Sequence, residues 1–353
     1  MRDYKWCYRP NAISDSEYID MTKDCKKFKM DRGYNKFKSS KEEKKFPIAY
    51  SILVYKSAEQ TERLLRAIYR PHNVYCIHVD AKASESMQSA IKSIGKCFQN
   101  VLTIENPISV RWAEITVVQA ELMCLKKLYN STTKWKYLIN LTGQDFPLKT
   151  NKQLVKILHA FNGGNDVDGT PHKRPIAWTE YSWRTEWWRT NSRKGPVPHE
   201  VLITKGSAHM AVSRKFIGYV LNSKIARDLL YWMADIRVPD EHYFSSLNHS
   251  PHLKVPGSYK GNPDLKPFVS RYKIWWTKVE KCSGTWQRFI CIIGLGDLYR
   301  LADRYELFVN KFDIDQDPLT LSCMEEWFYK RNEEKTDLNV SFYKNLPFVK
   351  NHV

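Results

Sequence analysis

Strand-like and helix-like segments alternate along the chain from Phe46 to Pro147. The apolar run at 48–55 predicts a buried strand, and the spacing of leucine and isoleucine over 58–69 predicts a helix directly after it. Further segments continue the pattern, with strands at 74–79, 101–104 and 136–140 and helices at 84–96 and 113–128. This alternation predicts an α/β fold with a mostly parallel sheet, whose ligands bind beyond the carboxyl ends of the strands. Asp80 and Asp145 follow two of these strands.

A polar arm precedes the alternating region, and a more irregular region follows it. Residues 1–45 are rich in lysine, and we interpret them as a stem or wrapping arm. The segment 162–200 has a Gly-Gly pair, four prolines and a tryptophan-rich stretch, which predicts a long loop. Because aromatic faces stack well on sugar rings, this loop is better explained as a binding element than as free surface. An amphipathic helix is expected near 223–235.

Eight cysteines, an even number, are spread from Cys7 to Cys323, and no Cys-x-x-Cys pair suggests a metal site. This pattern predicts four disulfides and an oxidising compartment. Glycan-processing enzymes, extracellular hydrolases and adhesion modules then become the main function classes, and cytosolic classes are disfavoured. No apolar stretch reaches the roughly 20 residues that span a bilayer, and the first thirty residues lack a signal-peptide core. Either the targeting segment has been removed from this chain, or the secretory route is not visible in this sequence.

Four acceptor patterns for N-glycans agree with a secretory route. They begin at Asn130, Asn140, Asn248 and Asn339. Asn140 ends an apolar run, so we expect it at a buried strand end and without sugar. We predict glycans on Asn130, Asn248 and Asn339.

The chain is strongly basic, with a net charge of +18. Such a field attracts polyanions and phosphorylated ligands, although a solubilising surface explains the charge equally well. Nucleic acid is not expected as a partner, because the sequence has neither zinc-finger spacing nor an aromatic RNA-binding signature. The diphosphate of a nucleotide sugar suits the same field.

Few residues stand out as candidates for chemistry. Asp240 and Glu241 should lie near a helix N-terminus, where acidic residues usually cap the first turn, but a carboxylate aimed into a cleft is a candidate base. Arg288 and Lys311 are candidates for neutralising a diphosphate, although each alone is more typical of a solvated surface. The Asp-x-Asp strings at 166–168 and 313–315 are weak metal signals, because two carboxylates so spaced arise readily by chance.

Eight ordered motifs carry a resemblance that covers nearly everything after about residue 20. The motifs are Phe46-Pro-Ile-Ala-Tyr-Ser51, Leu64-Leu-Arg-Ala-Ile-Tyr69, Val74-Tyr-Cys-Ile-His-Val-Asp80, Trp135-Lys-Tyr-Leu-Ile-Asn-Leu141 with Asp145-Phe-Pro147, Gly206-Ser-Ala208, Pro239-Asp-Glu-His242, Gly294-Leu-Gly-Asp-Leu298 and Asn310-Lys-Phe-Asp313. Together they resemble the core 2/I-branching β-1,6-N-acetylglucosaminyltransferases, the enzymes that branch mucin-type O-glycans.

The resemblance implies an α/β glycosyltransferase fold of the GT-A type and a specific reaction. Residues 46–150 would form the nucleotide-binding half, and 151–353 the acceptor-binding and catalytic half. Family members transfer GlcNAc from UDP-GlcNAc with inversion and without a metal ion or other cofactor. By resemblance, Glu241 is the catalytic base, and Arg288 and Lys311 replace a metal on the leaving diphosphate. One carboxylate suits a single inverting displacement, whereas a hydrolase would use two opposed carboxyl groups.

The resemblance also implies the surroundings of the site and the disulfide pairing. It places four residues at the donor nucleotide and four at the acceptor sugar. The donor residues are Asp80, Leu53, Tyr55 and Trp112, and the acceptor residues are Asp168, Lys173, Arg174 and Trp275. The implied disulfides are Cys7–Cys323, Cys25–Cys97, Cys76–Cys124 and Cys282–Cys291.

Departures from the family pattern fall mainly in the acceptor region. Thr142 stands where members often have a free cysteine, His209-Met210 where they have Tyr-Phe, and Trp275-Trp276-Thr277 where they have Trp-x-Tyr. Asp168 is shorter than the usual Glu. We expect the acceptor to be GalNAc of core 1 O-glycans, with galactose (I-branching) or a xylosyl transfer as alternatives within the family.

The expectations also cover the cellular location of the protein, its assembly and a function without catalysis. The resemblance implies a type II membrane protein of the Golgi, facing the lumen, with an anchor outside this sequence, and it leaves a homodimer open. From a different class, the chain could be a silent, basic glycan-binding protein. The intact set of Glu241, Arg288 and Lys311 argues against silence.

Overall fold

The computed structural model describes residues 11–173, 175–276, 280–334 and 338–353. Within this part of the chain, the central sheet has six strands in the order β3-β2-β1-β4-β9-β6. Their bounds are β1 Ile48–Val54, β2 Val74–Val79, β3 Val101–Thr103, β4 Tyr137–Thr142, β6 Asp166–Val167 and β9 Met210–Ser213. The first four in chain order pair in parallel, whereas β9 runs antiparallel to both β4 and β6. The predicted alternation is confirmed, and β2 has the predicted bounds.

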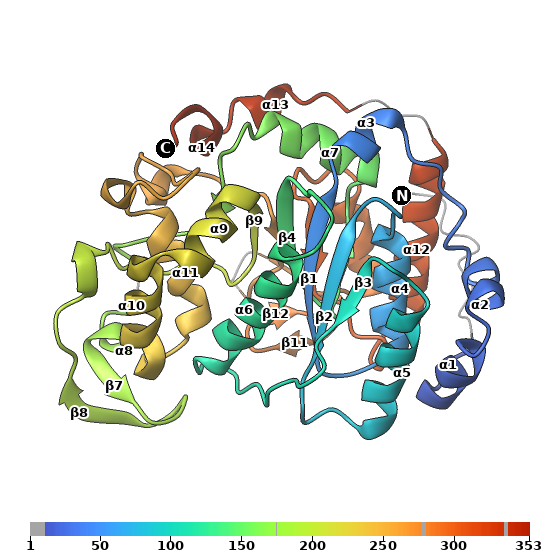
Figure 1. The fold of residues 1–353 in the computed structure, drawn as a ribbon, viewed down its shortest axis with the longest axis horizontal. Helices are drawn as coiled ribbons and strands as arrows, with labels where there is room; N and C mark the ends of the chain where they lie inside the picture. Colours follow the sequence, from blue (N-terminus) through green and yellow to red (C-terminus); the bar gives the residue numbers. More distant parts are fainter. Residues whose placement is uncertain (1–10, 174, 277–279, 335–337) are drawn as a thin grey trace.

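Helices cover both faces of this sheet, as Figure 1 shows. They are α4 Ala58–Ile68, α5 Glu85–Lys96, α6 Thr116–Tyr129, α7 Asn151–Ala160, α9 Arg214–Asn222, α10 Lys224–Trp232 and α11 Tyr243–Asn248. On one face Tyr50 and Tyr75 pack with α4, α5 and α7, and on the other Ala49 and Cys76 pack with α6, α9, α10 and α11. Because both faces are buried, the strands are continuously apolar rather than alternating.

A second, smaller sheet lies beside the first and carries part of the candidate site. It consists of β5 Asp145–Pro147, β13 Phe308–Asn310 and β10 Arg271–Tyr272, with β13 in the middle. Its core packs against α12 Pro318–Glu333. Asp145 precedes Arg271 by more than a hundred positions in sequence, yet both belong to this sheet, and the strand β13 leads directly into Lys311.

The amino-terminal arm is helical and firmly attached to the body. It contains α1 Asp15–Met21, α2 Cys25–Asp31 and α3 Lys41–Lys45, and Figure 1 shows α1 and α2 beside α5. Tyr18 and Phe28 are almost completely buried in the main core. The disulfide Cys25–Cys97 joins α2 to the end of α5, with a Cα–Cα separation of 5.0 Å. The arm therefore packs into the fold it was expected to wrap.

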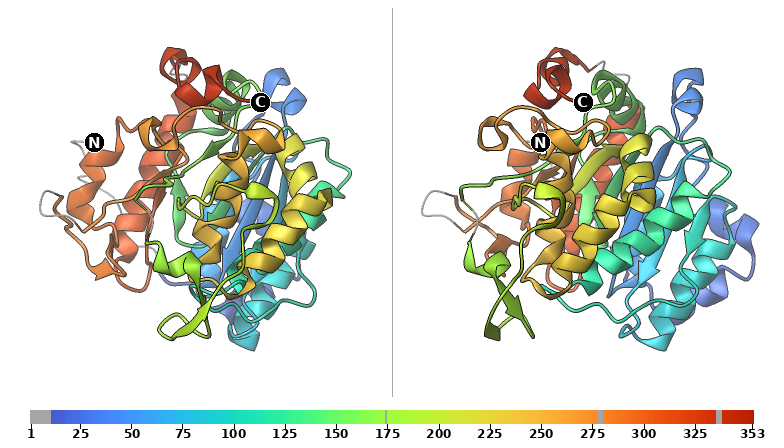
Figure 2. Two further views of the ribbon diagram at one scale, coloured as in Figure 1. Left: turned by 90° about the vertical axis from the view of Figure 1, so that its left-hand side faces the viewer. Right: turned by 60° about the vertical axis from the view of Figure 1, so that its left-hand side comes forward.

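The tryptophan-rich segment is more regular than the predicted loop. After α8 Ala177–Glu180, the strands β7 Tyr181–Trp183 and β8 Arg189–Arg193 form an antiparallel hairpin. Figure 2 shows this hairpin extending away from the body of the molecule. The Arg237 guanidinium lies 4.6 Å from the ring centroid of Trp178 and 5.2 Å from that of Trp183. Cation–π contacts thus hold the base of the hairpin against the body.

The predicted disulfides have different outcomes. Cys25–Cys97 and Cys282–Cys291 are confirmed. The predicted bond between Cys76 and Cys124 is absent from the structure, where both cysteines are buried free thiols. Burial, together with the neighbouring Cys76 thiol, raises the pKa of Cys124 well above its ordinary value, which disfavours the thiolate needed for oxidation. The remaining prediction, Cys7–Cys323, involves Cys7, which lies outside the described residues.

The predicted glycan sites differ in how far they are exposed to solvent. Asn130 and Asn339 are exposed, but Asn248 in α11 is fully buried, where its side-chain oxygen accepts a hydrogen bond from Asn165 at 3.2 Å. The prediction for Asn248 is therefore wrong, because its amide nitrogen cannot carry a bulky polar glycan in this core. Asn140 is buried as expected. Among the described residues, none of the helices has the length and apolar character that crossing a bilayer demands.

Candidate active site

A buried ion pair within the smaller sheet supports the candidate site. Arg271 Nε lies 3.1 Å from Asp145 Oδ1, and neither side chain is exposed to solvent. The Thr142 N–H at the end of β4 donates to the other carboxylate oxygen at 2.6 Å. Burial opposes ionisation of this carboxyl, but the charge of Arg271 and the nearby His209 outweigh it and lower the pKa of Asp145 to about 2. Asp145, expected at a strand end, therefore fixes one sheet to the other.

Glu241 lies at the end of a short 3₁₀ turn, η3 Pro239–Glu241, that leads into α11. Its carboxylate does not turn toward the helix but faces Lys205, whose Nζ is 2.6 Å from Oε2. The Gly206 N–H donates to the Glu241 carbonyl at 2.7 Å, so the backbone on both sides of this contact is held. Both side chains are about a quarter exposed (25% and 26%), which leaves Glu241 open to a ligand. A base function is thus better supported than plain capping.

Asp240 has a different environment from its neighbour. Its Oδ1 is buried and has no hydrogen-bond partner among the described residues. Burial, and then the adjacent charge of Glu241, raise the pKa of Asp240 to about 7. Asp240 therefore carries a proton below about pH 7.

Positive charges gather on the other side of the site. Burial first, and then the charges of Lys273 and Arg288, lower the pKa of Lys311 to about 8. Lys311 Nζ also donates to Gln287 at 2.9 Å. Lys273 interacts electrostatically with Glu241 and also acts on the charge of Lys311, so it belongs to the same charged cluster as both. Cations held close together in a partly buried site favour the binding of an anionic ligand.

Of the predicted donor residues, Trp112 lies next to one of these cations. The Arg288 guanidinium is 4.4 Å from the ring centroid of Trp112, which is 42% exposed. The Asp80 carboxylate, beyond the end of β2, accepts a hydrogen bond from the Val110 N–H at 3.3 Å and so holds the segment that leads to Trp112. Leu53 is half-buried in β1, and Tyr55 directly after that strand is 51% exposed. An exposed aromatic ring next to fixed cations suits a base and its phosphates.

The predicted acceptor residues are only partly brought together. Asp168 is half-buried, and it and Glu241 both act on the charge of Lys273, whose Nζ lies 5.4 Å from the ring centroid of Trp275. Trp275 is 46% exposed. Lys173 is exposed and is held through its backbone N–H, which donates to Thr170. Arg174 lies outside the described residues.

The two Asp-x-Asp strings already have protein partners. Asp166 is buried and accepts a hydrogen bond from Ser270 Oγ at 2.7 Å, and Asp313 pairs with Lys56 at 2.5 Å. In the part of the chain that the structure describes, one group of side chains has metal-like spacing. It consists of Cys282, Cys291 and Asp297, and its two sulfur atoms are bonded to each other. We therefore derive no metal chemistry from these residues.

Three lysines of the site were not predicted from the sequence. Lys205 pairs with Glu241, Lys273 joins the carboxylate to the cations, and Lys56 pairs with Asp313. A signal was available for Lys273, because a single lysine between Tyr272 and Ile274 interrupts a buried, strand-like segment. Lys205 and Lys56 follow ordinary surface patterns.

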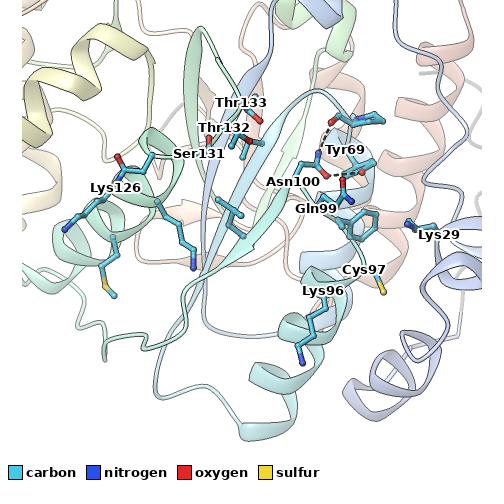
Figure 3. A pocket seen from close by; sticks show the side chains of 17 residues that line it. Lys29, Tyr69, Lys96, Cys97, Gln99, Asn100, Lys126, Ser131, Thr132 and Thr133 are labelled. Atoms are coloured by element: carbon cyan, nitrogen blue, oxygen red, sulfur yellow. Dashed lines mark hydrogen bonds between the residues drawn. The ribbon is translucent and has the colours of Figure 1, made fainter.

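A cavity of about 1140 Å³ lies elsewhere in the described part of the chain. Lys29, Lys96 and Lys126 are among the residues that line it, and Figure 3 labels them. Asn100 and Thr133, also labelled, precede β3 and β4, so the cavity lies at the amino-terminal edge of the sheet. Ligands of such sheets bind at the opposite edge, and none of the candidate catalytic residues lines this cavity.

The candidate site thus combines a carboxylate and a cluster of cations with a mostly parallel sheet flanked by helices, which is compatible with a glycosyltransferase. Comparison with known proteins gives the family. The family model described as Core-2/I-Branching enzyme matches residues 48–302. The chain belongs to this family, and the predicted resemblance and GT-A-type α/β fold are confirmed.

Similar proteins cover most of the chain. Beta-1,3-galactosyl-O-glycosyl-glycoprotein beta-1,6-N-acetylglucosaminyltransferase 3 of Rattus norvegicus is 38% identical over 344 residues, which are 93% of this chain and 78% of that protein. The enzyme numbered 4 of Danio rerio is 38% identical over 89% of this chain and 77% of its own. The transferase of the same name from Bovine herpesvirus 4 is 36% identical, with 92% and 77% covered.

Proposed function

We propose that the protein transfers GlcNAc from UDP-GlcNAc to the 6-hydroxyl of an acceptor sugar, with inversion and without a metal ion. The acceptor that we favour is GalNAc of core 1 O-glycans, so that the product is a core 2 branch. The observation that carries the proposal is the open Glu241 carboxylate opposite the cations around Lys311, in a chain of the Core-2/I-branching family. The similar proteins from Rattus norvegicus and Danio rerio are named as beta-1,6-N-acetylglucosaminyltransferases, which supports GlcNAc as the transferred sugar and a β-1,6 linkage.

The reaction needs one general base for the acceptor hydroxyl and a set of cations that bind the leaving diphosphate. Glu241 takes the proton of the acceptor 6-hydroxyl while that oxygen attacks the anomeric carbon of the donor, and the bond from this carbon to the UDP oxygen breaks. A single attack from the opposite face inverts the configuration. Negative charge then grows on the diphosphate, where the fixed cations of Arg288 and Lys311 offset it as a divalent ion otherwise would.

Aromatic side chains supply binding surfaces on both sides. Trp112, already stacked with Arg288, would lie along the uridine, with Tyr55 and Leu53 nearby. Trp275 would stack against the acceptor sugar, and Asp168 would accept hydrogen bonds from its hydroxyl groups. The proposal extends to location: a Golgi-lumenal enzyme that is anchored by a segment outside this sequence, with glycoproteins as acceptors and a homodimer as one possible assembly.

The deciding experiment measures UDP release from UDP-GlcNAc with and without the core 1 disaccharide, in the presence of EDTA. We expect acceptor-dependent release that survives chelation and a product with a β-1,6 linkage. Glu241→Gln should lower turnover by roughly 100-fold or more, as loss of a general base does. Asp240→Asn, which leaves the base in place, should cost much less.

Other outcomes would contradict the proposed base, the independence from metal, the acceptor or the enzymatic activity itself. Near-normal turnover of a folded Glu241→Gln protein would refute the base, and loss of activity in EDTA with recovery in manganese would move attention to Asp166 and Asp313. Preference for a lactosamine acceptor or for UDP-xylose would select one of the alternatives within the family. No release with any acceptor would favour a glycan-binding protein.

A further inference from the structure

Lys205 is fixed against Glu241 more firmly than an ordinary surface ion pair. The backbone N–H of Lys205 donates to the Thr170 carbonyl at 3.0 Å, and its carbonyl accepts from the Thr170 N–H at 2.8 Å. The next residue, Gly206, donates to the Glu241 carbonyl. The backbones that carry the two charges are thus tied to their surroundings and to each other. In contrast, the pair Lys27–Asp31 joins two well-exposed side chains on one helix.

The space around the Lys205 ammonium is also limited. Its Nζ lies 5.8 Å from the ring centroid of Trp178, and the Arg237 guanidinium lies 4.6 Å from the same centroid. An ammonium between an aromatic ring and a carboxylate gains from both contacts, so it has little reason to swing away. With Oε2 of Glu241 engaged by Lys205, Oε1 is left for a hydroxyl group of the acceptor.

Charged groups of both signs surround Glu241. Asp240 is its neighbour in the same turn, and the charge of Glu241 opposes ionisation of Asp240. Lys205 and Lys273 are the cations that interact with this pair, and Lys273 also interacts with Asp145 and Asp168. Among the described residues, Lys205 forms the ion pair with Glu241, at 2.6 Å. It is therefore the cation best placed to orient the Glu241 carboxylate.

We propose that Lys205 is a positioning residue, which keeps the Glu241 carboxylate ionised and holds it with one oxygen directed at the acceptor hydroxyl. This role rests on the proposed function of Glu241 as the base. Lys205 gives up no proton in the reaction.

The test compares the pH dependence of kcat/KM in four forms of the full chain. Lys205→Gln should move the acidic limb to higher pH by about one unit, because a carboxylate that loses its cation ionises less readily. Its plateau should fall about tenfold through lost orientation. Lys205→Arg keeps the charge and should restore both. Asp240→Asn should move the acidic limb the other way, to lower pH, because a like charge is removed.

Controls separate this role from folding and from the proposed function. Lys27→Gln breaks an exposed ion pair far from the site and should leave the profile unchanged. Thermal melting and UDP binding should be the same for Lys205→Gln and the unchanged protein. If Glu241→Gln is inactive while Lys205→Gln keeps the unchanged limb and plateau, the role of Lys205 is refuted. If Glu241→Gln stays active, the proposed base fails first.

Discussion

At the residue scale, the cations of the candidate donor site are the most informative groups. Lys311 is partly buried and near Lys273 and Arg288, and these three influences lower its pKa to about 8. The nearby carboxylate of Asp313 opposes this shift but is itself paired with Lys56. The site therefore keeps like charges together at a cost in stability, which is reasonable only if an anion joins them.

This arrangement predicts an alkaline limit to activity. Lys311 must carry its proton to offset the diphosphate, and it loses that proton as the pH rises through about 8. We therefore expect kcat/KM for UDP-GlcNAc to fall above this pH. The limb in kcat should lie higher, because a bound diphosphate favours the charged lysine. Initial rates from pH 6 to 10 provide the measurement.

Substitutions at Lys311 make the assignment specific. Lys311→Arg keeps a charge that does not titrate in this range, so the alkaline decline should disappear even if the rate is lower. Lys311→Ala should also lack the decline, with a much lower rate. Lys126→Ala, at the distant cavity, is the matched control and should leave the profile as it was. A persistent decline in Lys311→Arg would mean that another group titrates.

At the scale of elements, the segment around Gly206 packs closely against the turn η3 and the end of β6. A Cβ atom at Gly206 would lie 2.0 Å from the Asp168 carbonyl oxygen, so no side chain fits there. Ser245 Oγ holds the same carbonyl at 2.8 Å. Glycine thus allows the segment that carries Lys205 to approach the end of β6 and η3, and this approach brings Asp168 and Glu241 to one site.

Gly206→Ala should therefore disturb both stability and activity. We expect a loss of about 1–3 kcal/mol in unfolding free energy, as overpacking usually costs, because the obstructing atom belongs to the backbone. Turnover should fall by about tenfold or more, since small displacements of catalytic groups are costly. Chemical denaturation and kinetics test the two effects.

A second glycine offers the control for this substitution. Gly195, in the loop after β8, has nothing within 4 Å of an added Cβ. Gly195→Ala should change the unfolding free energy by less than about 0.5 kcal/mol and leave the rate unchanged. Equal effects at both glycines would show that the close approach at Gly206 is not the cause.

At the scale of the whole molecule, burial decides which acceptor asparagines can carry sugar. Expressed in a secretory cell, the protein should lose one glycan in Asn130→Gln and one in Asn339→Gln, because both asparagines are exposed. Asn248→Gln should remove none, since Asn248 is fully buried. Gel mobility before and after enzymatic deglycosylation measures this. A mobility shift for Asn248→Gln would contradict the core packing around α11.

Much of the fold and part of the site could be predicted from local patterns. The parallel sheet follows from the alternation of apolar strands and amphipathic helices, and neighbouring residues encode these periods directly. The ordered motifs identified Glu241, Arg288 and Lys311, because a family signature is a property of short segments. The regular hairpin β7–β8 was missed, since its strands are short, polar and exposed and so lack a core-facing period.

The sequence by itself determined the elements, their order and the chemical groups that the family motifs mark. Only the tertiary structure decided which groups interact: Lys205 with Glu241, and Lys273 with both that carboxylate and Lys311. It also decided that Asp166 and Asp313 are occupied by protein partners and that Asn248 is buried. The physical reason is the range of the interactions. Secondary structure depends on residues within a few positions, whereas ion pairs and burial depend on the path of the whole chain.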